Sequence, residues 1–468
     1  MDIRTLRQSR NIRLRDLAKL LDVTQYELSK YERGLVLPNA EIFSRLAEIF
    51  QLEPSLLISA QKDIERFATP GEGYTTANTV VEKTIHPSEV VRKNSIRIMD
   101  LFCGTGGFSH GFEQTGAFQV TLGIDLLNDR IETFHANHPG SSALAADIRG
   151  ISFEKLNSLT DKPDVIIGGP PCQGFSSIRP FRTLTEEDRR NNLYESFALI
   201  SNYYRPDWFI LENVVGLLTH KGRKTFKTII QLFEQIGYTT SWKVLNAALY
   251  GLPQRRERLI IIGNKHGKIF HWPAATHYFN GRSMAGDIHG QKASNLPLFG
   301  EELQYAVTVM EAIHDLPEIE SGCSSNEYRT DTQLTDYERQ MRGNNNRLTL
   351  HESTKHSSKM LEIIRNAGHN RSALPEGMTT SGFSSSYSRL EPDLPSVTLT
   401  VNFVHPASNK CIHPYQDRAL TPREGARLQG FEDRYYFAGN RTQVVKQIGN
   451  AVPPLLGKVI AESLIDQL

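Results

Sequence analysis

The sequence is poor in cysteine, and the few cysteines it has are scattered. Of 468 residues only four are cysteines, and no two of them form a CxxC pair: Cys103, Cys172, Cys323 and Cys411. So small a number at such distances argues against a disulfide framework and against a zinc site. We therefore expect a reduced cytoplasmic protein that holds no metal.

Long apolar runs and an excess of charge are also missing. No stretch of 18 or more apolar residues occurs, and residues 1–17 are charged without the apolar centre of a signal peptide. These absences predict neither a membrane span nor secretion. The formal net charge is only +1, so a nucleic-acid partner would have to be bound by local basic patches.

The N-terminal 60 residues predict a small all-helical domain. Residues 14–23 carry apolar residues at helical spacing, and Thr24 with Glu27 forms a capping-box pattern at the start of the next short helix. A third amphipathic helix over 39–52 completes a helix-turn-helix pattern. A generic three-helix packing module is the alternative interpretation.

The phrase "SKYERG" within this domain resembles the Cro/repressor-type family. The resemblance implies that the helix over 24–34 is a recognition helix, and that the domain could dimerise on operator DNA. The side chains that would face the major groove are Gln25, Tyr26, Ser29 and Lys30.

The rest of the chain predicts a doubly wound, mostly parallel α/β sheet with an insertion. A linker is expected over 61–93, because polar, glycine and threonine residues there follow no period. Strands and helices alternate over 94–270, residues 271–415 form a loop-rich second domain, and 416–468 completes the first.

A glycine-rich turn follows the first buried strand of that sheet. Gly104, Gly106 and Gly107 would let the backbone approach a ligand closely, and Asp125 ends the next strand, where it could take ribose hydroxyls. Asp147 and Ile148 follow the third strand. This pattern fits NAD dehydrogenases and methyltransferases about equally. The FxGxGG form of the turn, and the lack of other dehydrogenase features, favour S-adenosylmethionine.

A lone cysteine, Cys172, follows the strand "DVII" in the rigid turn "GGPPCQGFS". Ligands bind at the carboxyl ends of such strands, so we interpret it as a nucleophile rather than as a structural residue. Glu212 and Asn213 end the next strand. In "QRRER", Arg256 and Arg258 alternate, which predicts that both side chains point to one face.

In this order the motifs resemble the C5-cytosine DNA methyltransferase family, over about 95–265 and 415–465. The stretches are DLFCGTGGF, PPCQGFS, ENV, QRRER, RALTPREGARLQGF and QIGNAVPP. The resemblance implies a methyltransferase fold in which 271–415 is the target-recognition domain. It implies cofactor contacts from Phe102, Gly104, Thr105, Gly107, Asp125, Leu126, Asp147, Ile148, Gly169, Pro171, Leu193, Asn450 and Val452. Leu126 departs from the aromatic residue that many members carry.

The resemblance further implies a mechanism. The Cys172 thiolate adds to C6 of a cytosine flipped out of duplex DNA, and a loop over 176–194 closes on it. Catalytic roles fall to Cys172, Glu212, Asn213, Arg256 and Arg258, and further DNA contacts to Gln173, Ser176 and Arg255. Arginines 329, 342, 347, 365 and 371 are candidate contacts of the recognition domain.

We therefore interpret the chain as a DNA cytosine-5 methyltransferase, monomeric in catalysis. It would modify the site that a companion restriction endonuclease cuts, and its helix-turn-helix domain would regulate transcription. Two alternatives stay open: a regulator whose methyltransferase fold only senses S-adenosylmethionine, and a tRNA cytosine-5 methyltransferase. The target sequence, the oligomeric state and the group that removes the C5 proton do not follow from the sequence.

Overall fold

The computed structural model describes residues 7, 10, 12–32, 40–50, 82–89, 95–171, 193–283, 293–294, 302–379 and 385–468. The chain divides into two compact units, Met1–Val81 and Glu82–Leu468. Among the described residues no helix is both long and apolar enough to cross a membrane.

The described residues of the first unit form helices α2 (Leu14–Leu20), α3 (Gln25–Glu32) and α4 (Ala40–Phe50). They share an apolar core that includes Leu17, Leu28 and Leu46. The expected capping box is present, because the Glu27 N–H donates to Thr24 Oγ1 (3.1 Å) and the Thr24 N–H donates to Glu27 Oε2 (2.8 Å).

The second unit is built on an eight-stranded sheet of order β1-β4-β3-β2-β5-β6-β9-β7. Strands β4, β3, β2, β5 and β6 run parallel, whereas β1 and β9 are antiparallel to their neighbours. The strands are β1 (Lys83–Ile85), β2 (Ile96–Leu101), β3 (Phe118–Asp125), β4 (Ser142–Ala145), β5 (Val165–Gly168), β6 (Trp208–Val214), β7 (Thr239–Asn246) and β9 (Glu257–Asn264). The expected doubly wound α/β fold is confirmed.

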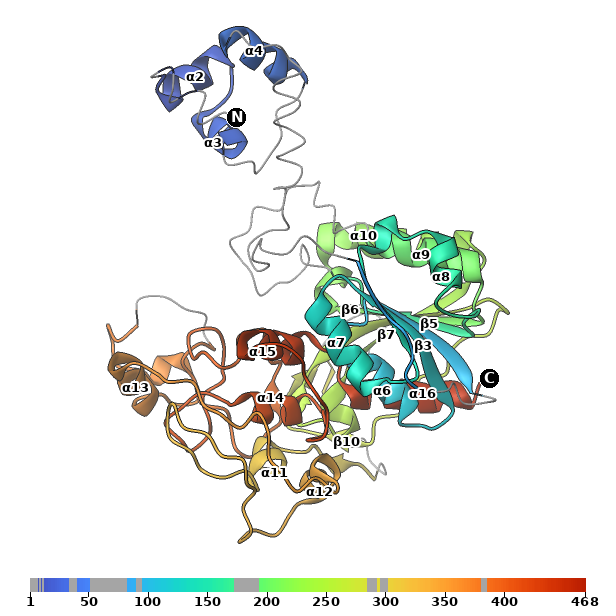
Figure 1. Ribbon diagram of the computed structural model, residues 1–468. Helices are drawn as coiled ribbons and strands as arrows, with labels where there is room; N and C mark the ends of the chain where they lie inside the picture. The colour runs from blue at the N-terminus through green and yellow to red at the C-terminus, as the bar shows by residue number, and fades with distance from the viewer. Residues whose placement is uncertain are drawn as a thin grey trace. The chain divides into compact units, whose positions relative to one another are not determined.

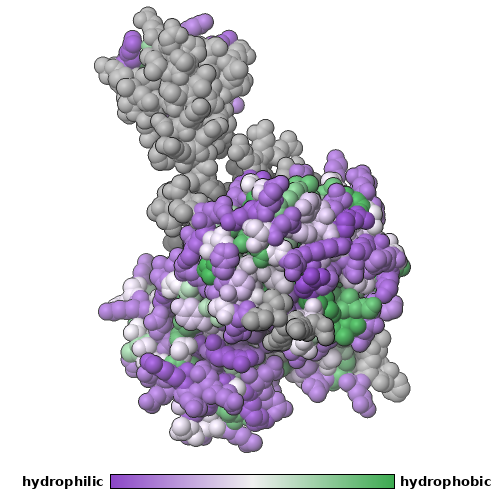
Figure 2. Space-filling view, turned by 45° about the vertical axis from the view of Figure 1, so that its right-hand side comes forward, coloured by the Kyte–Doolittle hydropathy of each residue, from purple (hydrophilic) through white to green (hydrophobic). Residues whose placement is uncertain are grey.

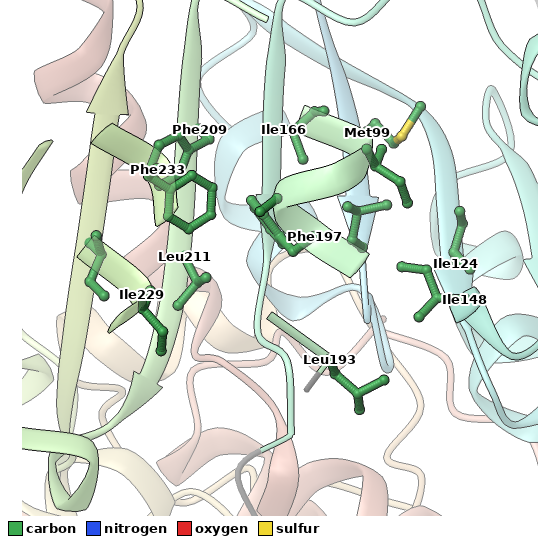
Figure 3. Close-up of a cluster of buried hydrophobic side chains, with 14 of the residues drawn as sticks. Met99, Ile124, Ile148, Ile166, Leu193, Phe197, Phe209, Leu211, Ile229 and Phe233 are labelled. Atoms are coloured by element: carbon green, nitrogen blue, oxygen red, sulfur yellow. The ribbon is translucent and has the colours of Figure 1, made fainter. Parts of the chain in front are cut away.

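Helices cover both faces of this sheet (Figure 1). On one face lie α8 (Phe153–Asn157), α9 (Leu193–Tyr204) and α10 (Lys224–Gln235). On the other lie α6 (Gly107–Glu113), α7 (Asn128–Asn137) and α16 (Pro454–Ile465). Figure 3 shows Phe197 of α9 at the centre of the first apolar layer, with Leu193 set apart at one end. We call the sheet and these helices the sheet lobe.

A second apolar cluster defines a second lobe, residues 307–451. Its helices are short: α11 (Val309–Ile313), α12 (Asp336–Arg342), α13 (Ser358–Arg365), α14 (Pro422–Leu428) and α15 (Arg441–Asn450). Paired strands of two residues lie in and beside it: β8 (Gln254–Arg255) with β14 (Ser396–Val397), β10 (His277–Tyr278) with β13 (Gln304–Tyr305), and β11 (Arg282–Ser283) with β12 (Ala293–Ser294). One-turn 3-10 helices complete the chain at 148–150, 215–218, 220–223, 247–250 and 371–373.

Two expected boundaries need correction. The predicted linker 61–93 contains β1, which pairs with β4 through its backbone and has no apolar pattern to reveal it. The segment 416–468 does not all complete the sheet lobe. Helices α14 and α15 belong to the core of the second lobe, and only α16 packs on the sheet (Figure 1).

The surface of the second unit is mostly polar on the face that Figure 2 shows, with apolar residues gathered in a few places. The large apolar side chains are instead shared among the internal clusters, of which three are extensive. This distribution is the ordinary one for a folded chain in water.

Candidate active site

The glycine-rich turn between β2 and α6 has an unusual backbone. Phe102 (φ 66°), Gly104 (φ 53°) and Gly106 (φ 84°) all lie in the left-handed region. A phenylalanine in that region is strained by about 1–2 kcal/mol, so its surroundings must hold it there. A Cβ on Gly104 would meet nothing within 4 Å, whereas a Cβ on Gly107 would lie 2.4 Å from the Val452 carbonyl oxygen. The turn is therefore open at Gly104 and closed at Gly107.

Asp125 at the end of β3 braces this turn. Its Oδ2 accepts a hydrogen bond from the Gly104 N–H (3.0 Å), and its Oδ1 accepts one from the Leu127 N–H (3.0 Å). Desolvation raises the pKa of the Asp125 carboxyl, although both N–H groups oppose that shift. Each carboxylate oxygen keeps a further lone pair, so Asp125 can still accept from a ligand. Leu126 follows it in the half-buried turn.

Asp147 follows β4 and is paired with Arg149, which the sequence interpretation did not include. The Arg149 N–H and Nε donate to Asp147 Oδ1 at 3.1 and 2.9 Å, and its Nη2 bonds to Oδ2. These bonds lower the pKa of Asp147. Ile148 beside them is buried. Ile148 and Leu193 both belong to the apolar cluster on the α9 side of the sheet (Figure 3).

The turn after β5 is held against β6. Asn213 Nδ2 donates to the Pro170 carbonyl oxygen (3.2 Å), which anchors the backbone of the proline pair. A Cβ on Gly169 would lie 2.8 Å from Glu212 Oε2, so only glycine leaves room for that carboxylate. Pro171 is exposed. Cys172, Gln173 and Ser176 lie outside the described residues.

Glu212 forms an ion pair with Arg258 across the antiparallel β6 and β9. Arg258 Nε lies 2.7 Å from Glu212 Oε1, and each side chain is about 11% exposed. Burial lowers the pKa of Arg258, and the Glu212 carboxylate opposes that shift. The pair therefore joins a carboxylate and a guanidinium that are both nearly buried.

Arg256 has other partners than Arg258, although we expected the two to serve one face. It lies between β8 and β9, is fully buried, and donates to the carbonyl oxygens of Leu399 (3.3 Å) and Gly449 (3.2 Å). Its hydrogen bonds thus fix backbone in the second lobe. Arg255 in β8 is half-buried, and its carbonyl oxygen accepts from Thr398 (2.9 Å).

The chain end returns to the glycine turn. Asn450 is exposed at the end of α15, and Val452 follows it against Gly107. Buried amides fix this return: Gln254 Nε2 donates to Gln429 Oε1 (2.6 Å), and Gln429 Nε2 donates to the Ala451 carbonyl oxygen (2.6 Å). Thr105 is buried in the turn. Three motifs far apart in sequence therefore meet at one place.

The predicted recognition-helix residues lie in α3 of the first unit. Gln25 is exposed. The side chains of Tyr26, Ser29 and Lys30 lie outside the description. In the described part of the chain, no cluster of three or more His, Cys, Asp or Glu side chains could hold a metal ion.

With this geometry established, comparison with known proteins decides the family. The model described as "C-5 cytosine-specific DNA methylase" matches residues 96–466, about four fifths of the chain. The chain belongs to this family. It is an enzyme that acts on DNA, and a helix-turn-helix model also matches residues 3–57.

Members of this family with curated names include bacterial type II methyltransferases. The chain is 34% identical to Type II methyltransferase M1.HphI of Haemophilus parahaemolyticus, over 79% of this chain and 87% of the relative. It is 31% identical to M.AgeI of Thalassovita gelatinovora, over 79% and 99%. Each of the two matches leaves about a fifth of this chain unaligned.

A solved structure from Escherichia coli carries the same architecture. Its name describes a DNA modification methyltransferase encoded within a prophage, and it is 26% identical with a TM-score of 0.60. The match covers 80% of this chain and 99% of that one. The C5 methyltransferase fold is therefore established for the second unit.

Proposed function

We propose that the protein transfers a methyl group from S-adenosylmethionine to C5 of a flipped-out cytosine in a specific duplex DNA sequence. The observation that carries this proposal is the Glu212–Arg258 pair, held beside the turn that leads into Cys172. A carboxyl and a guanidinium so placed can hydrogen-bond N3 and O2 of a cytosine, where charge develops when a nucleophile adds to the ring.

The residues of the glycine turn fit S-adenosylmethionine. Gly104 leaves the turn open to a ligand, Asp125 offers acceptors for ribose hydroxyls, and Asn450 is exposed. Phe102, Asp147 and Ile148 would frame the adenine, with Leu193 as a cover. The cofactor supplies a methyl group on positively charged sulfur, which a carbon nucleophile can accept.

The protein's part is to make C5 nucleophilic. The Cys172 thiolate forms a bond to C6, Glu212 gives a hydrogen bond or proton to N3, and Arg258 holds O2. The ring becomes an enamine whose C5 can take the methyl group. A base then removes the C5 proton, the C6–S bond breaks, and the electron pair restores the aromatic ring. This chemistry needs access to both faces of the cytosine ring. The cytosine must therefore leave the duplex, at a cost of a few kcal/mol.

Methyl transfer from labelled S-adenosylmethionine tests the proposal. We expect the purified full chain to label unmethylated duplex DNA and not tRNA, and Cys172→Ser to abolish labelling. We expect Glu212→Gln and Arg258→Ala to lower kcat by roughly 10²–10³-fold, as loss of a charge-stabilising group does. Bisulfite sequencing of the product identifies the methylated cytosine. No labelling of duplex DNA by the wild type would refute the proposal.

The covalent adduct has its own test. A duplex with 5-fluorocytosine at the identified position should trap Cys172, because fluorine cannot leave C5 as a cation. A denaturation-stable complex should form with the wild type and not with Cys172→Ser. Methyl transfer without a trapped complex would contradict the covalent route and leave the overall reaction standing.

We also propose that the N-terminal unit regulates transcription, in a system with a companion endonuclease that cuts the methylated site. Two observations support this: the helix-turn-helix match covers residues 3–57, and the methylase match begins only at residue 96. A footprint on the gene's own promoter, lost when residues 1–60 are deleted, is the expected result. Unchanged expression together with lost methylation in that deletion would contradict the proposal.

A further inference from the structure

Two side chains from outside the glycine turn hold its backbone carbonyl groups. The Tyr435 hydroxyl donates to the Thr105 carbonyl oxygen (2.6 Å), and His138 Nε2 lies 3.2 Å from the Gly106 carbonyl oxygen. Both side chains are buried. Both hydrogen bonds therefore hold the backbone at Gly106, which is in the left-handed conformation.

The histidine is fixed from both sides of its ring. Its Nδ1 lies 2.6 Å from Glu113 Oε2, and Glu113 Oε1 accepts a hydrogen bond from the Val120 N–H (2.9 Å). A Cβ on Gly106 would lie 2.5 Å from His138 Nε2. Only glycine at position 106 therefore leaves room for the His138 ring, and the ring cannot turn without losing a hydrogen bond.

The tyrosine reaches the turn from the second lobe. Tyr435 belongs to that lobe's apolar core together with Phe431, whose ring also lies against Gly107. Two residues earlier, Asp433 bonds to the buried Arg423 and Arg427. Burial raises the pKa of Tyr435, so its hydroxyl stays a donor. The position of this donor is thus set by the folding of the second lobe.

We propose that Tyr435 and His138 are positioning residues for cofactor binding. By holding the carbonyls of Thr105 and Gly106, they keep the turn in the shape that receives S-adenosylmethionine, one from each lobe. Neither side chain would touch the methyl group or the base. This inference rests on the proposed function, because it takes the turn as the cofactor site.

Variants of the full chain test it through direct binding of S-adenosylhomocysteine by calorimetry. We expect Tyr435→Phe and His138→Asn to weaken binding roughly five- to tenfold, the loss of one hydrogen bond. Asparagine can still reach Glu113 but not Gly106. His138→Gln, whose amide reaches the position of Nε2, should recover most of the affinity. Tyr436→Phe is the matched control. Tyr436 is next to Tyr435 in the chain but is exposed, so loss of its hydroxyl should leave the affinity for S-adenosylhomocysteine unchanged.

Steady-state kinetics separate positioning from loss of structure. We expect KM for S-adenosylmethionine to rise with the dissociation constant, while kcat at saturating cofactor changes less than about twofold. Wild-type affinity in both Tyr435→Phe and His138→Asn would overturn the inference. So would a fall in kcat at unchanged KM, which would mean only a smaller folded fraction. A wild type that binds no S-adenosylhomocysteine would overturn the proposed function itself.

Discussion

The two lobes of the second unit are stabilised in different ways. The sheet lobe surrounds long parallel strands with apolar side chains. In the described residues of the second lobe the strands have two residues and the helices are short, and Arg418, Arg423 and Arg427 are completely buried. Each of these arginines meets a buried carboxylate. Both lobes have an apolar core, and the second lobe adds fully buried ion pairs to its core.

Polar side-chain contacts also stabilise the starts of helices in the second lobe. Helices α11, α12 and α14 each begin with a complete capping box, at Thr308, Thr335 and Thr421. These helices have only five to seven residues, so they are too short to be stable alone. The capping boxes give hydrogen-bond acceptors to N–H groups at the helix starts, which have no acceptor within the helix.

The largest expected effect is on stability, from Arg427→Met. Arg427 donates to Asp433 Oδ1 and Oδ2 (3.0 and 2.7 Å), to Asp315 Oδ2 (3.0 Å) and to the Ala312 carbonyl oxygen (3.1 Å). Methionine would fill the space but leave two buried carboxylates without this partner. We expect the free energy of unfolding in urea to fall by about 3–5 kcal/mol.

Arg434→Met is the matched control for that experiment. Arg434 also pairs with a carboxylate, Glu432, but its side chain is 75% exposed. We expect a change within about 0.5 kcal/mol. Equal losses in the two variants would mean that burial of the ion pair is not what distinguishes the second lobe.

This contrast explains which features could be predicted from the sequence. Apolar strands followed by polar residues predicted Asp125 and Glu212 near the carboxyl ends of parallel strands, which share one edge of the sheet. Arg258 reaches the same edge from the start of the antiparallel β9. The bonds from Arg149 and Tyr435 carry no such pattern. The Tyr435 hydroxyl meets Thr105 across 330 residues of sequence, so only the packing of one lobe on the other creates the contact.

In the region 271–415, too, contacts with distant segments could not be predicted from the sequence. Its lack of apolar period predicted loops, and the described residues there include helices α11, α12 and α13 and strands of two residues. Its core forms with α14 and α15, which come later in the chain. His351 and His356 in this region are buried. His351 bonds to Thr421 and to the Pro317 carbonyl oxygen, and no local pattern could have shown those partners.

The next effect is a pH dependence of opposite sign at two buried groups, one taken from each lobe. Burial raises the pKa of Asp100 in β2 to about 7, against a hydrogen bond from Ser109. The folded chain therefore holds this proton more tightly than the unfolded chain. The resulting stability is complete below about pH 4, the ordinary aspartate pKa, and is lost as pH rises through about 7.

His413 in the second lobe behaves in the other direction. Burial lowers its pKa to about 4, and its Nδ1 accepts from the N–H groups of Tyr415 (3.2 Å) and Gln416 (3.0 Å), which requires the neutral ring. This stability is present above the unfolded pKa of about 6.5 and is lost as pH falls through about 4.

Urea unfolding across pH separates the two groups. Relative to wild type, Asp100→Asn should gain stability as pH rises from about 4 to 7, and His413→Asn should gain as pH falls from about 6.5 to 4. Each change should be roughly 2–4 kcal/mol over its window, an upper bound from the pKa shifts. Asparagine at either position keeps a polar group but cannot titrate. Parallel slopes for the two variants would contradict the opposite signs.

The smallest effect compares two helices of equal length, one from each lobe. Helix α11 begins with the Thr308–Glu311 capping box, whereas α8 in the sheet lobe has a single side-chain cap from Ser152. Thr308→Ala removes the acceptor for the Glu311 N–H and should cost about 1 kcal/mol in urea unfolding. Thr308→Ser keeps the hydroxyl and should stay near wild type. Ser152→Ala should cost less, because the apolar layer beneath Phe153 and Leu156 also holds α8. A larger loss at Ser152 than at Thr308 would mean that the sheet lobe depends on helix caps as much as the second lobe does.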